Sequence, residues 1–339
     1  MSHYLGGAVA WPLSVRAQQV GGEAAMLCAD PINRENAFAD IAEWHLGQRL
    51  IHRHRTMFGK WPRLFPPISF NEHILHRLIY DRDPRLKVIC DKVALRQFVQ
   101  EMVGSKHNVP LLGVYEHPKE IDWQTLTGKF VLKPSHVSGR YIIIDQPRGV
   151  INKDRVDRRS KVAEQWLSLD YFEATLEWGY RGIPRRLLVE PFLQSPSGTQ
   201  ALEIQIYTFA GRAALITLIN GEKYTPNRRH AWFDATGRRI QVDAGRQVAM
   251  EYPTADITIK SDIMCSAVEL AEFISADFSS LRVDLYLTGD GLKIGELTPY
   301  TYGGGTRWKP RTLDDTLGML WKPDFDLSII PSFTEQTAR

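Results

Sequence analysis

Two acidic residues inside neighbouring apolar runs constrain the fold of this chain more than any other sequence feature. They lie within residues 281–307, where Asp284 interrupts one apolar run, Glu296 interrupts the next, and the turn sequence Thr-Gly-Asp-Gly separates the two. Burying two carboxylates near each other is costly unless a cation compensates for their charge. The stretch therefore fits either a metal-binding hairpin or a surface hairpin whose charged side chains face water.

The spacing of the two acids sets a geometric requirement on this hairpin. If Leu287 pairs with Leu292 in a regular ladder, strand alternation places Asp284 and Glu296 on opposite faces of the sheet. A shared metal site then requires a five-residue loop, or a β-bulge near the glycines. We expect such an irregularity, and we expect the three glycines at 303–305 to approach a bound substrate closely.

Composition favours an ordinary globular protein over a nucleic-acid-binding or membrane-spanning one. The 339 residues are 43% hydrophobic, and 42 basic against 39 acidic residues leave a net charge of +3, too small to indicate a nucleic-acid partner. No apolar run approaches the ~18 residues of a membrane span. The three cysteines are widely spaced, which fits a reducing compartment, and we expect a cytoplasmic protein.

The chain begins with a segment that resembles the end of a bacterial export signal, with a short apolar stretch followed by Ala-Gln-Gln. It lacks a basic start and a full apolar region, so we expect it to be poorly ordered or misassigned. Apolar spacing then predicts a helix over about 34–57, which ends in the basic sequence at 52–55. That sequence fits either a solvated helix end favoured by the helix dipole or a patch for a substrate phosphate.

Capping residues and periodicity predict further elements. Ser69 and Glu72 form a capping-box pattern at the start of a helix. Pro191 has no N–H, so the apolar strand that contains it must end, bulge or act as a connector there. Other helices are expected over 91–104, 162–176 and 262–276, and strands over 109–115, 130–133, 141–144, 187–193, 201–209 and 213–219.

Taken in order, several segments resemble the ATP-grasp superfamily over about residues 85–320. They are Asp91-Lys92, Lys133-Pro134-Ser135 with a glycine-containing loop, Val189-Glu190-Pro191-Phe192, Arg282-Val283-Asp284, and Glu296. The sequences FNEHILHRLIYDRDP, DKVALRQFV, VPLLGVYE, FVLKPSHVSG and GELTPYTYGGG resemble more closely the branch named for teichuronopeptide biosynthesis, from about residue 58 onwards.

The resemblance implies an α+β ATP-grasp fold, in which two α+β subdomains clasp ATP behind a helical N-terminal region. The implied boundaries are a leader and helical segment at 1–57, a helical region at 58–125, a small lid subdomain at 126–193, a C-terminal subdomain with the metal site at 194–325, and a tail at 326–339.

The resemblance also implies nucleotide-binding residues. Lys92 and Lys133 would reach the phosphates of ATP, with a structural salt bridge as the alternative for each lysine. A flap over the phosphates would include His136, Ser138 and Gly139, although this loop departs from the branch's usual Asn-His-Gly-Ser-Gly pattern.

The adenine and ribose would be held further along the chain. Glu190 would lie in the hinge that holds adenine, with the backbone of Phe192 and Leu193 lining the base. Glu203 would lie near the ribose or the lid. Gln205 stands where the branch commonly has a lysine, and the missing positive charge would come from Lys223 or Arg228.

Magnesium would be bound by Asp284 and Glu296 and bridged to the phosphates. Thr298 stands where many relatives have asparagine and would be a weaker ligand. Arg282 shares a face with Asp284 by strand alternation, and together with Lys133 it is a candidate catalytic residue that would stabilise charge on the transferred phosphoryl group.

The activity implied is that of an ATP-dependent carboxylate–amine ligase acting through an acyl-phosphate. One substrate would be a sugar acid, a polysaccharide or another small acid, and the other an amino acid that supplies the amine. The basic residues at 153–161 would suit an acidic acceptor. Two alternatives are a kinase on the same fold and a nucleotide-binding protein without catalysis. The sequence indicates neither the substrates nor the oligomeric state.

Overall fold

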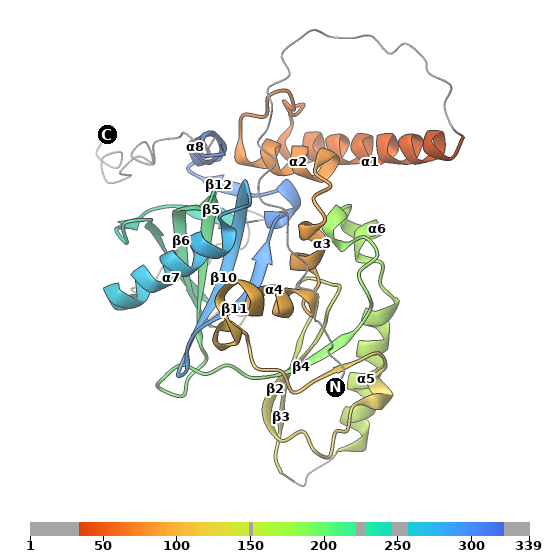
Figure 1. The fold of residues 1–339 in the computed structure, drawn as a ribbon, viewed down its shortest axis with the longest axis vertical. Coiled ribbons are helices and arrows are strands. Elements are labelled where there is room, and N and C mark those ends of the chain that lie inside the picture. Colours follow the sequence, from red (N-terminus) through yellow and green to blue (C-terminus); the bar gives the residue numbers. More distant parts are fainter. Residues whose placement is uncertain (1–33, 149–151, 222–227, 246–256, 322–339) are drawn as a thin grey trace, which may run out of the picture. The chain divides into compact units, whose positions relative to one another are not determined.

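The computed structural model describes residues 34–148, 152–221, 228–245 and 257–321, with side chains from Glu43 onwards. The chain divides into two compact units, Met1–Ala42 and Glu43–Arg339. The mixture of helices and antiparallel sheets confirms the α+β class (Figure 1). The predicted leader and tail lie outside the described residues.

Two antiparallel sheets form the framework of the larger unit. The smaller sheet has four strands in the order β1-β4-β2-β3, and the larger has six in the order β11-β10-β5-β6-β7-β8. The smaller consists of β1 (Gly113–Tyr115), β2 (Gly128–Pro134), β3 (Ile142–Gln146) and β4 (Leu187–Pro191). The larger consists of β5 (Leu202–Phe209), β6 (Arg212–Asn220), β7 (Arg229–Asp234), β8 (Arg239–Ile240), β10 (Ser280–Thr288) and β11 (Gly291–Thr298). A separate two-stranded sheet pairs β9 (Asp243–Gly245) with β12 (Arg307–Lys309).

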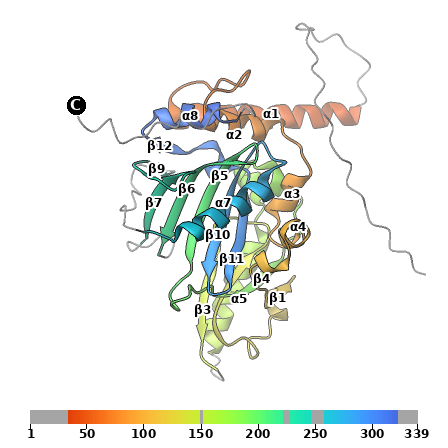
Figure 2. The same cartoon turned by 60° about the vertical axis from the view of Figure 1, so that its left-hand side comes forward.

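Helices cover these sheets. Figure 2 shows α7 lying along the larger sheet, where it contacts β5, β6 and β10. The helix α5 packs on β2 of the smaller sheet, and α2 packs against α8. The helices are α1 (Arg34–Phe58), α2 (Phe70–Tyr80), α3 (Arg85–Cys90), α4 (Ala94–Val103), α5 (Lys153–Ser168), α6 (Tyr171–Thr175), α7 (Ser261–Ser275) and α8 (Thr312–Met319), with a short 3-10 turn, η4, at Thr301–Gly304.

Each sheet has its own hydrophobic core. The smaller core joins β2, β3 and β4 to α5, and its centre is formed by Phe130, Leu132 and Ile144, each at most 1% exposed. The larger core joins the six-stranded sheet to helices α2, α3, α4 and α7. Burying a side chain of this size contributes about 1.5–3 kcal/mol, so both cores contribute substantially to stability.

Local sequence signals predicted several boundaries correctly. The capping box is formed, since Ser69 Oγ accepts a hydrogen bond from the Glu72 amide at 3.3 Å and the Glu72 carboxylate accepts one from the Ser69 amide at 3.2 Å. The strand β4 ends at Pro191, as its missing N–H requires.

Other boundaries differ from the prediction. The helix expected from Asp91 begins at Ala94, because Asp91 Oδ1 first accepts a hydrogen bond from the Val93 amide at 2.9 Å and closes a turn. The helix expected over 162–176 is two helices, α5 and α6. The first begins after the N-cap Asn152, so the basic residues at 153–161 are helical. The strand expected over 109–115 is limited to β1. No helix in the described ranges is long and apolar enough to cross a membrane.

Candidate active site

The hairpin formed by β10 and β11 contains the irregularity that a shared metal site requires. Near the turn Leu287 pairs with Leu292, as in a regular ladder, but the register shifts between Leu285 and Asp284. Gly295 is the extra residue of this β-bulge, and Asp284 lies directly opposite Glu296. Directly opposed residues share a face of the sheet, so the two acids face the same side.

Gly295 is also the residue type that the bulge requires. A Cβ atom at this position would lie 2.4 Å from Cε2 of the Tyr286 ring, far inside van der Waals contact. The ring of Tyr286 therefore occupies the space that a side chain at Gly295 would need.

Asp284 is buried and held by an arginine from its own strand. Its side chain is 5% exposed, and its two carboxylate oxygens accept hydrogen bonds of 2.6 Å from Nε and from a terminal nitrogen of Arg282. Burial raises the pKa of Asp284 to about 6, although Arg282 opposes that shift. Arg282 also donates to Thr298 Oγ1 at 3.3 Å, so the three side chains predicted on this face lie together.

The neighbouring strand β5 extends this polar face. Gln205 pairs with Asp284 in register, and its Nε2 donates to Glu203 Oε1 at 2.7 Å and to Asp284 Oδ2 at 3.3 Å. Arg228 lies 3.3 Å from the Glu203 carboxylate, and both side chains are 9% exposed. Arg228 therefore supplies a positive charge beside Glu203 and Gln205, whereas Lys223, the other candidate, lies outside the described residues.

Lys92 connects this face with a charged pair on the smaller sheet, where the Lys133 ammonium lies 2.6 Å from the Glu190 carboxylate. Burial lowers the pKa of Lys92 to about 8, while Glu296 opposes that shift and the charge of Lys133 adds to it. Lys92 therefore lies within electrostatic reach of both sheets. Its Nζ donates to the Val137 carbonyl at 2.8 Å, in the loop after β2.

Residues 72–322 match the family model described as TupA-like ATP-grasp. The chain belongs to this family. No curated protein sequence matches the chain.

Solved ATP-grasp enzymes resemble this TupA-like protein only distantly. Two structures of the ATP-grasp ligase PsnB, one with a minimal precursor and one with a phosphomimetic variant of it, Mg and ADP, are 10% and 12% identical, with TM-scores of 0.35 and 0.39. The two matches cover 67% and 74% of this chain, and 59% and 67% of the respective PsnB chains. D-alanine–D-alanine ligase from Bacillus anthracis, complexed with ATP, is 13% identical, with a TM-score of 0.35, and the match covers 62% of this chain.

The TupA-like chain spans only 55% of the length of that D-alanine–D-alanine ligase chain. Membership of the TupA-like ATP-grasp family therefore rests on the match to the family model.

The loop after β2 is anchored at its start and accessible at its tip. Nε2 of His136 lies 3.2 Å from the Trp166 carbonyl of α5, and the ring is buried, which lowers the pKa of His136. Ser138 is half-buried, and Gly139 is exposed with φ +73°. Ser138 and Gly139 are therefore the accessible part of the predicted flap, whereas the His136 side chain contacts α5.

The hinge after β4 already uses one of its main-chain donors. The Phe192 amide donates to the Lys129 carbonyl at 3.0 Å, and Lys129 Nζ lies 3.9 Å from the centre of the Phe192 ring. The Leu193 carbonyl accepts from the Ala201 amide at 3.1 Å. Because Pro191 has no N–H, a hydrogen bond from this hinge to adenine would come from Leu193 or beyond.

Two of the three glycines after β11 have a packing role that we did not expect. A Cβ atom at Gly304 would lie 3.3 Å from the Asn71 carbonyl, and one at Gly305 would lie 2.0 Å from Cε of Met57. Gly304 and Gly305 therefore allow close packing against α1 and α2, and the expected close approach of the glycines to substrate stays a prediction.

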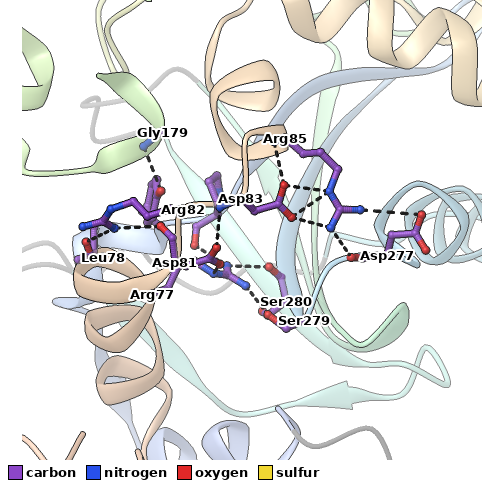
Figure 3. Close-up of polar contacts among 12 residues, drawn as sticks. Arg77, Leu78, Asp81, Arg82, Asp83, Arg85, Gly179, Asp277, Ser279 and Ser280 are labelled. Carbon is purple, nitrogen blue, oxygen red and sulfur yellow. Dashed lines mark hydrogen bonds and ion pairs between the residues drawn. The ribbon is translucent and has the colours of Figure 1, made fainter. Parts of the chain in front are cut away.

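Two buried residues of α2 that hold the site were not predicted. Figure 3 shows Arg77 beside the strand ends, where one terminal nitrogen donates 2.8 Å hydrogen bonds to the carbonyls of Ser280 and Pro299. Arg77 thereby ties the start of β10 to the residue that follows β11. Asn71, which is fully buried, exchanges two 2.8 Å hydrogen bonds with the backbone of Thr306, just after the glycines.

A third residue, Arg96, has a sequence signal. It lies on α4, four residues after Lys92, which precedes that helix. In the structure its guanidinium lies 3.5 Å from Glu190. The spacing of two cations four positions apart, Lys92 and Arg96, was therefore a usable sign of a distant acidic partner.

The donor set fits a magnesium ion that arrives with a nucleotide. Mg²⁺ is usually bound by one or two carboxylates together with substrate phosphates, and Asp284 and Glu296 are two carboxylates facing each other. Within the described ranges, no group of three or more His, Cys, Asp or Glu side chains could hold a metal ion by itself. Nucleotide phosphates would complete the coordination.

Proposed function

We propose that this protein is an ATP-dependent carboxylate–amine ligase. The observation that carries the proposal is the bulged hairpin that places Asp284 opposite Glu296, with Lys92 in electrostatic reach of Glu296 and of the Lys133–Glu190 pair. The two carboxylates of the hairpin and the ammonium groups of Lys92 and Lys133 would act together on the nucleotide phosphates. Phosphoryl transfer depends on such positioning and charge neutralisation rather than on a protein nucleophile.

The nucleotide would lie between the two sheets. Lys92 and Lys133 would contact its phosphates, with Ser138 and Gly139 closing over them. In the structure Lys133 is paired with Glu190, so binding would require it to share its ammonium with a phosphate. Glu190 and the backbone of Phe192 and Leu193 would border the base, and Glu203 with Arg228 would border the sugar.

Magnesium would be held by Asp284 and Glu296, with Thr298 as a neutral oxygen nearby. When bound, it neutralises charge on the phosphates. Asp284 must be ionised to bind it, and Arg282 favours the ionised carboxylate. Arg282 and Lys133 would stabilise the negative charge of the transferred phosphoryl group.

The reaction would proceed in two steps. A carboxylate oxygen of the first substrate attacks the terminal phosphorus of ATP, and the bond to ADP breaks, which gives an acyl-phosphate. The amine nitrogen of the second substrate then attacks the acyl carbon. Phosphate leaves with the bonding electrons, the nitrogen loses a proton, and an amide results.

The first substrate would be a sugar acid, a polysaccharide or another small acid, and the amine would come from an amino acid. Exposed basic residues of α5, including Arg155 and Arg158, support an acidic substrate. Because β1 pairs with β4, we propose that the small subdomain also includes residues 113–115, ahead of the boundary at 126. Use of ATP favours a cytoplasmic location.

The test is a screen of carboxylate and amine pairs by phosphate release, with mass detection of the product. Amide formation with one phosphate released per product supports ligation. A phosphorylated carboxylate that accumulates whether or not an amine is present indicates a kinase. ATP binding without ADP formation in any substrate mixture, measured by calorimetry and nucleotide analysis, indicates a protein without catalysis and contradicts the proposal.

A further inference from the structure

A basic segment without acidic residues lies outside the candidate active site. Residues 44–68 contain no Asp or Glu but five basic residues and three histidines: Arg49, Arg53, Arg55, Lys60, Arg63, His45, His52 and His54. The sequence left open whether the basic run at 52–55 is a solvated helix end or a phosphate patch. The structure divides that run, because two of its members face inward and two face outward.

The inward-facing residues have structural roles. Arg53 donates to the Thr175 carbonyl at 2.7 Å and to the Gly303 carbonyl at 3.0 Å, and the ring of His54 is buried. They share the packed side of α1 with Leu46 and Leu50. The opposite side of α1 exposes Trp44, His45, Arg49, His52 and Arg55, which we call the basic face.

The connection that follows α1 presents apolar side chains to solvent. In residues 59–68, Trp61 is 55% exposed, Phe65 is 71% exposed and Ile68 is 41% exposed. Lys60 directly precedes Trp61, Arg63 lies between Trp61 and Phe65, and both basic side chains are exposed. Large exposed apolar side chains grouped with cations are characteristic of interaction surfaces rather than of ordinary solvated loops.

This connection is held in place by Glu72. One Glu72 oxygen accepts a hydrogen bond from the Arg63 amide at 3.0 Å, and the other accepts one from the Ile68 amide at 3.1 Å. Burial would raise the pKa of Glu72, but these backbone N–H groups and that of Ser69 lower it, so the carboxylate stays ionised. Three prolines, at 62, 66 and 67, restrict the backbone further.

The exposed rings also have fixed neighbours. The Arg55 guanidinium lies 4.2 Å from the centre of the Trp61 ring, and the Phe65 ring lies 5.4 Å from that of Tyr80. The loop therefore displays its apolar side chains from a constrained backbone. In the part of the chain that the structure describes, none of Arg49, Lys60 and Arg63 has an acidic side chain within ion-pair distance.

We propose that the basic face of α1 and the connection 59–68 dock on an anionic phospholipid surface. Trp and Phe side chains enter the interface between headgroups and acyl chains, while Arg and Lys side chains attract anionic headgroups. Both kinds of side chain are displayed here within one stretch of 25 residues, 44–68. The docking is peripheral, and it is independent of the proposed ligase activity.

The chemistry favours a lipid surface over a nucleic acid. Nucleic-acid binding requires cations and stacking rings, but Ile68 offers neither, and it is exposed beside Phe65. The α5 helix provides an internal comparison, since it has a similar density of exposed arginines and no exposed aromatic residue of its own. Because α5 also carries Asp154, Asp157 and Glu164, it lacks both the unopposed positive charge and the exposed aromatic residues that a lipid interface requires.

The test is sedimentation of the full chain with large vesicles of phosphatidylcholine containing about a quarter phosphatidylglycerol, against vesicles of phosphatidylcholine alone. We expect binding to the anionic vesicles, weakened by salt, and little binding to the neutral ones. At about fivefold per basic residue, Arg49→Gln with Lys60→Gln lowers the partition coefficient about twenty-five-fold. Trp61→Ser with Phe65→Ser also weakens binding, with unchanged helix content by circular dichroism.

The matched control is Arg155→Gln with Arg158→Gln on α5, which removes the same charge elsewhere and leaves binding unchanged. Equal loss in this control, or equal partition into neutral and anionic vesicles, overturns the proposal. Tight binding to a single-stranded oligonucleotide that depends on Arg49 and Lys60 but not on Trp61 and Phe65 would identify a nucleic-acid surface instead. None of these results depends on ATP turnover.

Discussion

Replacing Arg77 by methionine tests whether the open end of the β10–β11 hairpin depends on one buried guanidinium. The substitution keeps a long, flexible side chain but removes the charge. It eliminates the 2.8 Å hydrogen bonds to the carbonyls of Ser280 and Pro299 and a 2.7 Å bond to Ser279 Oγ. It also removes the ion pair with Asp81, whose carboxylate can turn to water because its side chain is 33% exposed.

The expected magnitude follows from burial. Hydrogen bonds to a charged group contribute about 1.5–3 kcal/mol each, but the Arg77 side chain is only 4% exposed, and burial lowers its pKa. Since the charge has already lost its hydration, part of the hydrogen-bond energy only offsets that cost. Removing one partner of such a buried polar network costs roughly 3–5 kcal/mol, and we expect a loss of this size in the free energy of unfolding.

Urea unfolding measures this loss, and Arg85→Met is the matched control. Arg85 forms a bidentate pair with Asp83 in the same region of Figure 3, but its side chain is 34% exposed. Exposed pairs contribute about 0–1 kcal/mol. If Arg77→Met and Arg85→Met lose the same free energy of unfolding, within about 1 kcal/mol, the stabilising role assigned to Arg77 is wrong. Binding of a non-hydrolysable ATP analogue should also weaken more with magnesium than without it in Arg77→Met.

Three further predictions concern the site itself. Asp284→Asn and Glu296→Gln should each abolish ADP formation. Glu296→Gln should leave the urea midpoint largely unchanged, whereas Asp284→Asn should lower it, because it leaves Arg282 buried without its carboxylate partner. Wild-type turnover in both variants would refute the metal assignment. Gly295→Ala should displace the Tyr286 ring, because the new Cβ would lie 2.4 Å from it; magnesium-dependent analogue binding should fall at least tenfold, or about 1.4 kcal/mol, and unchanged affinity would show that the bulge is dispensable. Analogue affinity with magnesium should fall below about pH 6, as Asp284 gains a proton, and above about pH 8, as Lys92 loses one. Lys92→Arg stays charged and should remove the upper limb only, as measured by calorimetry across that range.

The elements that sequence predicted well are those specified by neighbouring residues. The capping box at Ser69 and the strand end at Pro191 depend on groups within a few positions, and the hairpin of β5 and β6 depends on alternation around a glycine turn. Short strands such as β8 and β9 contain only two or three residues. They carry no periodic signal and are fixed by their partners.

The supports of the site are non-local for a physical reason. Arg77 reaches Pro299 across 222 positions, and Asn71 reaches Thr306 across 235. On the sequence, each is a polar residue in an otherwise amphipathic helix. Only the packing of α2 against the ends of the hairpin and the glycine segment gives these side chains their partners. The candidate ligands could be named from the family resemblance, but the groups that hold them in position could not.

The bulge at Gly295 also determines how changes of chain length would act on the hairpin. With Leu285 opposite Ile294, an unbulged ladder would place position 295 opposite Asp284. Deleting Gly295 would move Glu296 into that position and keep the two acids opposed. In a regular ladder, inserting a second residue there would move Glu296 opposite Arg282, on the same face as Asp284 but no longer directly across from it. In a regular ladder, an even number of residues between Ile294 and Glu296 therefore keeps the two acids on one face, and an odd number requires a bulge to do so. Related chains should tolerate the loss of this glycine more readily than the gain of a neighbour.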